Sequence, residues 1–152
     1  MIKNTHLSNN KTIKRKLNEI RLTKQLEKRY EKDEILEMYL NTIYFGHNCY
    51  GLQSAAEFYF NKKAENLHIA ESATIVGLLT SPNNYSPFKN PEKSLKRRNI
   101  VLGSMLECGY IDRQTYNETI EMPLNTVRTL SENNFGDYVD GVFDELEELN
   151  LD

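Results

Sequence analysis

A chain of 152 residues is long enough for one domain with a single core, or for part of a larger domain. The hydrophobic content of 39% and the charged content of 27% are ordinary for a globular domain, and no apolar run approaches the ~20 residues of a membrane helix. The net charge is -3, and the basic residues of the first helical segment are not interleaved with exposed aromatic residues, which argues against nucleic-acid binding. The first residues lack the apolar stretch of a signal peptide, so we expect any export signal or membrane anchor to lie upstream.

Helical periodicity extends over nearly the whole chain, which predicts an all-α fold. Ile13, Leu17 and Ile20 recur at the spacing of one helix face, while Lys and Arg fill the other face up to about Tyr30. Residues 1–32 carry ten Lys or Arg against three acids. This charge predicts either an anion-binding surface or an ordinary solvated helix face.

Capping and breaking residues divide the following segment. Asp33 is expected to cap a helix that ends near Asn41, before an irregular loop bracketed by Gly46 and Gly51. A short helix is expected over residues 52–60, and its small residues, Ala55 and Ala56, favour close helix contacts.

The next helices also have start and stop signals. Asn66 is expected to cap a helix over residues 67–79, which Ser-Pro at 81–82 ends. A loop over 80–90 then leads to Asn90, the cap of a helix with proline at its first position.

Similar start and stop residues mark the last predicted helices. Gly109 stops the preceding helix and Asp112 opens a shorter one that Pro123 ends. A final acidic helix is expected over residues 135–149. The two cysteines, Cys49 and Cys108, have no metal-site spacing and are interpreted as small packing residues.

The block over residues 34–46 contains residues that the requirements of an amphipathic helix do not explain. Residues 34–46 read EILEMYLNTIYFG and are followed by Tyr50-Gly51. Amphipathic spacing does not explain Asn41, the aromatic pair at 44–45 or two glycines five residues apart, so we interpret the block as part of a site. It closely resembles the fourth motif of the peptidoglycan glycosyltransferases (glycosyltransferase family 51), the domain that polymerises lipid II in class A penicillin-binding proteins and monofunctional transglycosylases.

The resemblance continues in register on both sides. Residues 15–19, Arg-Lys-Leu-Asn-Glu, are similar to the third motif, and residues 67–87, with Ser-Pro and Tyr-Ser-Pro, are similar to the fifth. The implied fold is the C-terminal part of a mostly helical, lysozyme-like glycosyltransferase domain over residues 1–122. Residues 123–134 are then a linker, and residues 135–152 an acidic helix that leads toward a following domain.

The spacing of the charged residues in the third motif indicates an anion site independently of the resemblance. Arg15 and Glu19 lie four residues apart on a helix, and Lys11 lies one turn earlier, so the three share a face. Cations beside one carboxylate suit a pyrophosphate, although an ordinary exposed salt bridge has the same spacing.

The resemblance implies roles for these residues. Lys3, Lys11, Arg15 and Lys16 are expected near the donor pyrophosphate, and Glu19 corresponds to the second acidic residue of the family's site. Glu19 either assists departure of the leaving group or organises the cations. No cofactor is certain, and a divalent cation, Mg or Mn, is the one considered at the pyrophosphate.

The fourth motif contributes Asn41, Tyr44 and Gly46. Asn41 and Tyr44 are expected either to contact the sugar or to order the loop, and Gly46 to serve backbone geometry. His47 has no carboxylate or second His at useful spacing, and His68 lies on a predicted helix, so both are interpreted as structural residues.

The family's first motif, with its general-base Glu, and most of its second are not recognisable in this chain. We therefore expect a fragment, inactive alone, of an enzyme at the outer face of the bacterial cytoplasmic membrane. Its expected partners are lipid II, the growing glycan strand, the membrane through an N-terminal segment, and cell-wall synthesis proteins, with no nucleic acid. The alternative is a non-catalytic module that binds a lipid pyrophosphate or a cell-wall partner.

Overall fold

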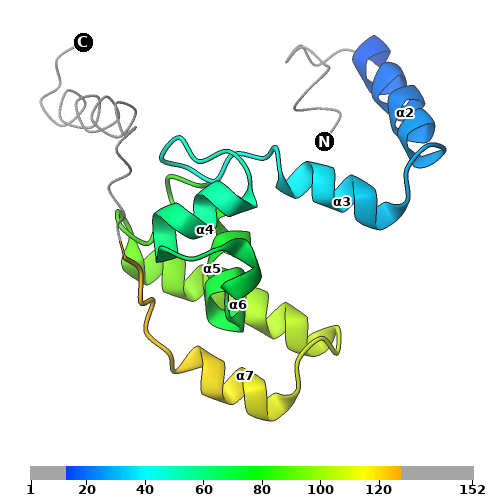
Figure 1. The fold of residues 1–152 in the computed structure, drawn as a ribbon. Helices are drawn as coiled ribbons and strands as arrows, with labels where there is room; N and C mark the ends of the chain where they lie inside the picture. Colours follow the sequence, from blue (N-terminus) through cyan, green and yellow to red (C-terminus); the bar gives the residue numbers. More distant parts are fainter. Residues whose placement is uncertain (1–12, 128–152) are drawn as a thin grey trace, which may run out of the picture. The chain divides into compact units, whose positions relative to one another are not determined.

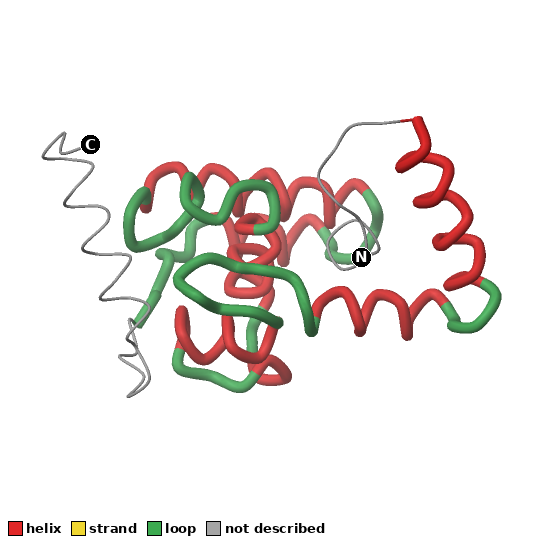
Figure 2. Tube along the Cα trace, turned by 90° about the horizontal axis from the view of Figure 1, so that it is seen from above, coloured by secondary structure: helices red, strands yellow, loops and turns green. Residues whose placement is uncertain are grey.

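The structure is a computed structural model that describes residues 13–127, with side chains from Lys16 onward. These residues form helices joined by loops, with no strand among them beyond an isolated bridge between Tyr44 and Tyr50 (Figure 2). The prediction of an all-α chain is therefore confirmed for the part that is described. In chain order the elements are α2 (Ile13–Glu27), α3 (Lys32–Leu40), α4 (Leu52–Phe60), the 3-10 turn η1 (Ala64–Asn66), α5 (Ile69–Leu78), α6 (Pro91–Glu107) and α7 (Arg113–Ile120) (Figure 1).

The chain divides into two compact units, residues 1–43 and residues 44–152, and each is described by itself. In the first unit, α3 begins after Glu31, whose backbone N–H donates to Glu34 Oε2 at 2.8 Å. The prediction that Asp33 caps this helix is wrong, because the Glu31–Glu34 pair starts it two residues earlier. Asp33 lies in the first turn, where a negative charge still favours the helix. None of the side chains described in residues 16–43 is fully buried.

The core of the second unit is built by α4, α5 and α6. Small side chains bring the helices together, and larger aromatic and aliphatic ones fill the space between them. The buried apolar residues of these helices are Ala55, Ala56, Phe58, Tyr59, Phe60, Ala70, Ala73, Ile75, Leu78 and Leu102. The predicted close contacts of the small residues at 55–56 agree with this packing.

The start of α5 differs from the prediction. His68 is the N-cap, whereas Asn66 ends the turn η1, because the extended backbone of Leu67 separates the two elements. Glu71, with a side chain only 5% exposed, accepts the backbone N–H of His68 at 3.1 Å and pairs with Lys62 Nζ at 2.8 Å. The helix start is therefore fixed by a buried carboxylate.

The two ends of α6 agree with the prediction. Asn90 precedes Pro91 at the first helical position, and Gly109, with φ +76°, follows the end of the helix. A buried Arg98 lies on the inner face of α6 with none of its surface exposed. Its guanidinium donates to the carbonyl oxygens of Met122 at 2.6 Å and Ile120 at 2.9 Å, which ties the end of α7 to α6. Burial lowers the pKa of Arg98.

Asp112 caps α7 as predicted. Its Oδ1 accepts the backbone N–H of Thr115 at 2.7 Å, and this bond lowers the pKa of the Asp112 carboxyl. Residues 123–127 are not helical. The rest of the predicted linker and the acidic helix predicted over residues 135–149 lie outside the described residues, so both stay predictions.

The two cysteines have different environments. Cys49 is buried, whereas Cys108 is exposed, so the prediction that both are packing residues is wrong for Cys108. Cys108 lies at the C-cap, past the last residue of α6, where it is exposed. Among residues 13–127, none of the helices combines the length and the hydrophobicity of a membrane-spanning segment.

Candidate functional site

Two of the predicted donor-site residues have described side chains. Lys16 Nζ lies 3.8 Å from Glu19 Oε2 on α2, with the Lys16 side chain 69% exposed and that of Glu19 21% exposed. This is a loose surface pair that contributes little to stability and leaves the ammonium group open to other anions. Arg15 lies in the first turn of α2, but its side chain, like all of Lys3 and Lys11, lies outside what is described.

A separate groove runs along α2. It has a volume of 370 Å³ and combines apolar with cationic side chains, namely Leu17, Ile20, Arg21, Lys24, Gln25 and Lys28. Glu19 follows Leu17 by two residues, which is more than half a turn around a helix. The groove and the predicted pyrophosphate face are therefore different surfaces of one helix.

No metal-ligand cluster is present within residues 13–127. No three His, Cys, Asp or Glu side chains of this part of the chain come together as ligands. Of the predicted site residues, Glu19 alone has a carboxylate.

The fourth-motif residues are divided between the two units. Asn41 is the exposed C-cap of α3, and its backbone N–H donates to Glu37 O at 2.9 Å. Tyr44 is the first residue of the second unit. The Tyr44 ring lies 5.0 Å from the Tyr50 ring, measured between centroids, at an angle of 42°.

Residues 44–51 form a tight loop that we call the motif loop. Four of its residues have positive φ: Gly46 at 91°, His47 at 47°, Asn48 at 57° and Gly51 at 87°. Two backbone bonds close it, from Phe45 N–H to Cys49 O and from Cys49 N–H to Gly46 O, both 2.8 Å. Left-handed backbone is costly for His47, so the surrounding structure must hold it in place.

Gly46 meets a second constraint. A Cβ at this position would lie 3.0 Å from the Tyr59 hydroxyl oxygen and 3.2 Å from Pro82 Cβ. Its backbone angle and the lack of space therefore both explain the glycine.

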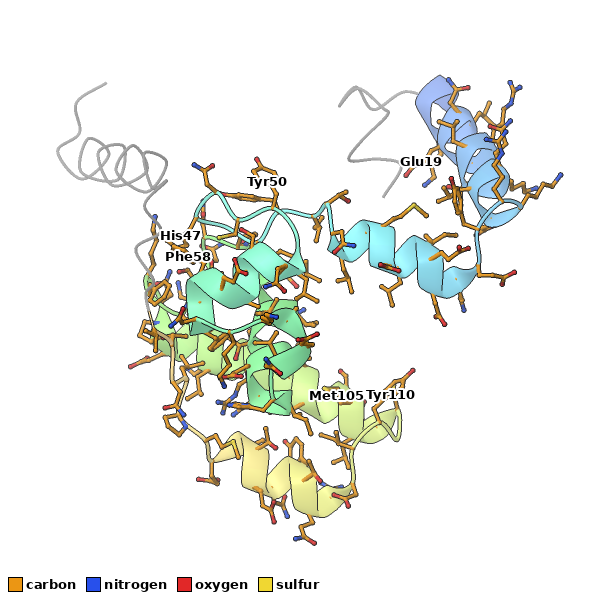
Figure 3. All side chains as sticks on the ribbon, viewed as in Figure 1. Glu19, His47, Tyr50, Phe58, Met105 and Tyr110 are labelled. Atoms are coloured by element: carbon orange, nitrogen blue, oxygen red, sulfur yellow. The ribbon has the colours of Figure 1, made fainter. Side chains whose placement is uncertain are left out.

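Aromatic rings from α4 and the 80–90 loop pack against the motif loop (Figure 3). His47 stacks on Phe58 with centroids 5.1 Å apart, and its Nε2 lies 3.1 Å from Ser86 Oγ. Tyr59 stacks on Phe88 at 5.5 Å and donates its hydroxyl to Phe45 O at 2.9 Å. These contacts with α4 and the 80–90 loop hold the motif loop in place.

The structure gives a role to residues that the sequence did not single out. Ser86 is fully buried and meets His47 although 39 residues separate them in the chain. Tyr50 is 64% exposed and pairs with Tyr44. The only signals for these residues were the Tyr-Ser-Pro and Tyr-Gly dipeptides within the resemblance. The roles predicted for the eight site residues stay predictions.

Comparisons with known proteins agree on one family. A family model described as Transglycosylase matches residues 1–106. Penicillin-binding protein 1A of Pseudomonas aeruginosa is 46% identical over 123 residues, which cover 81% of this chain and 15% of that protein. Penicillin-binding protein 1A/1B of Bacillus subtilis is 41% identical over 157 residues, covering 97% of this chain and 17% of that protein.

A solved structure is also similar. The crystal structure of penicillin-binding protein 1A from Haemophilus influenzae matches with a TM-score of 0.63 and 34% identity, covering 77% of this chain and 18% of that one. The predicted fold class is confirmed by this match. The chain thus spans less than a fifth of the length of each of these relatives. Because the family model matches more than two thirds of its residues, this chain belongs to the transglycosylase family.

Proposed function

We propose that this chain serves in peptidoglycan glycosyl transfer, the polymerisation of lipid II into glycan strands for the bacterial cell wall. The transglycosylase match over residues 1–106 carries the proposal, because that range contains every predicted site residue. The reaction takes place, on this proposal, at the outer face of the cytoplasmic membrane. Its partners are lipid II, the growing glycan strand and other cell-wall synthesis proteins.

The chemistry assigns a role to the cations of α2. An acceptor sugar hydroxyl attacks the anomeric carbon of the donor, and the bond from that carbon to the pyrophosphate oxygen breaks. The leaving pyrophosphate gains negative charge, which a fixed cation stabilises as it develops. Lys16 is suited to this role, because its weak pairing with Glu19 at 3.8 Å leaves its ammonium group able to bind a phosphate oxygen.

Glu19 has two compatible roles in this scheme. Its carboxylate, 21% exposed, either assists departure of the pyrophosphate or holds the neighbouring cations in place. A Mg²⁺ or Mn²⁺ ion would neutralise phosphate charge when bound, with Glu19 as its one ligand from the predicted site.

The donor site is tested by titrating the 152-residue chain with farnesyl pyrophosphate, a soluble lipid pyrophosphate. We expect Lys16→Ala to weaken binding about threefold, as for loss of one exposed charge contact. Lys24→Ala is the matched control, since it removes the same charge from the groove side of the same helix. Equal loss in both variants would indicate general charge attraction and contradict the assigned site.

Two further measurements complete the test. Repeating the titration with Mg²⁺ and with a chelator shows whether a divalent cation contributes to binding. With lipid II itself, the chain alone is expected to bind but not to polymerise, because only one carboxylate of the catalytic pair is recognisable in it. Efficient glycan synthesis by these 152 residues would contradict that expectation.

A further inference from the structure

We propose that the Tyr44–Tyr50 ring pair is a carbohydrate-binding surface, on which Tyr50 stacks against a sugar ring of the glycan. This inference rests on the proposed function, and it adds a residue and a ligand class to the motif loop. Tyr50 is the central residue because it is 64% exposed while its ring is paired with that of Tyr44 at 5.0 Å. In Figure 3 it lies on the outer side of the loop, away from His47 and Phe58.

The exposure of Tyr50 is unusual for its surroundings. Its loop neighbours Phe45, Cys49 and Gly51 are buried, so the loop covers its other apolar groups and leaves this ring in water. An exposed aromatic ring gains from covering by an apolar surface, and an exposed hydroxyl can still bind a polar group. A pyranose ring offers both, because its C–H groups form an apolar face and its hydroxyls form the edge.

The geometry of the motif loop indicates that the exposed Tyr44–Tyr50 pair is held rigidly, as a binding surface requires. A backbone bridge joins Tyr44 to Tyr50, and two left-handed residues, His47 and Asn48, form the turn between them. Contacts of His47 with Phe58 and Ser86 hold that turn. Strained backbone that the fold maintains at a defined place is a reason to seek a function there, and a preorganised loop loses little freedom on binding.

The lack of charged side chains in the motif loop favours a neutral ligand. Residues 44–51 contain no Lys, Arg, Asp or Glu, whereas residues 13–28 of the other unit contain six of the chain's Lys and Arg. A pyrophosphate therefore suits the basic helix, and the uncharged hydroxyl and ring surface of Tyr44 and Tyr50 suits a sugar. The proposed occupant is one uncharged pyranose ring of a glycan strand.

The test uses the 152-residue chain with chitotetraose, a soluble β-1,4-linked tetramer of N-acetylglucosamine. Binding is followed by amide NMR shifts, which report both affinity and position. We expect saturable shifts in residues 44–51, with Tyr50→Ala weakening binding about tenfold and Tyr50→Phe less than about threefold. Tyr110→Ala is the matched control, because Tyr110 is 80% exposed at the far end of α6 and has no ring partner among the described residues.

The outcomes separate this inference from the proposed function. Absence of saturable shifts in residues 44–51 at the highest soluble concentration overturns it, as does equal weakening by Tyr50→Ala and Tyr110→Ala. Unchanged unfolding midpoints exclude a folding defect as the cause. If farnesyl pyrophosphate binding still depends on Lys16 while Tyr50→Ala has no effect on chitotetraose, only the sugar surface fails. If sedimentation shows that Tyr50→Ala changes the oligomeric state instead, the pair is a protein contact and the inference is wrong.

Discussion

Three glycines of this chain separate backbone strain from steric crowding. Gly46 has a positive φ of 91° and no room for a Cβ, Gly109 has a positive φ of 76° with nothing within 4 Å, and Gly103 lies inside α6 with nothing within 4 Å. Replacing each by alanine therefore tests strain with crowding, strain alone and helix propensity alone.

The magnitudes follow from these environments. Gly109→Ala is expected to cost about 1–2 kcal/mol, the penalty of a left-handed residue with a Cβ. Gly46→Ala adds about 1–3 kcal/mol for overpacking, giving about 2–5 kcal/mol in total. The crowding is not easily relieved, because Tyr59 is fully buried and its hydroxyl is bound to Phe45 O. Gly103→Ala is expected to stabilise by about 0.5–1 kcal/mol.

The assay is equilibrium urea unfolding of the three variants and the wild-type chain, followed by far-ultraviolet circular dichroism. The free energy of unfolding should fall in the order Gly103→Ala, wild type, Gly109→Ala, Gly46→Ala. The reasoning is refuted if Gly46→Ala is no more destabilising than Gly109→Ala, because the contacts with Tyr59 and Pro82 would then carry no cost.

Two further changes test the anchors of α7. Arg98→Met should lower the free energy of unfolding by about 2–5 kcal/mol, because two charge-assisted bonds to carbonyl oxygens are lost. The control, Lys96→Met on the exposed side of α6, should change the free energy of unfolding by less than about 0.5 kcal/mol. Similar effects of the two substitutions would contradict the anchoring role of Arg98. The pKa of Asp112 is lowered by its bond to Thr115 N–H, so its stabilisation is present above the unfolded pKa of about 4 and lost as the pH falls through the folded pKa. The unfolding midpoint of wild type should therefore exceed that of Asp112→Ala at neutral pH and approach it in acid, and a constant difference would contradict this account.

Local signals predicted most helix boundaries correctly. Asn90 with Pro91, Gly109 and Asp112 act through their own backbone geometry or through a neighbour within three residues, so the sequence contains the whole cause. The two wrong caps, Asp33 and Asn66, failed because another residue nearby competes for the same role and local preference does not decide between them.

Long-range contacts could not be predicted in the same way. No local signal marks Arg98 as buried, because the carbonyl oxygens that accept its bonds lie 22 and 24 residues later in the chain. The contact of His47 with Ser86 likewise depends on how the 80–90 loop folds back. The candidate site residues came from motifs, and the motifs carry no information on which side chains the fold leaves exposed.

The unequal burial of the two thiols makes the motif loop accessible to a kinetic measurement. Cys49 is 4% exposed and its Sγ lies 3.4 Å from His47 O, whereas Cys108 is exposed at the end of α6. A thiol reagent should therefore modify Cys108 at once and Cys49 only when the loop opens. The slow phase of that reaction measures how often the loop opens, and it needs no label beyond the chain's own sulfur atoms.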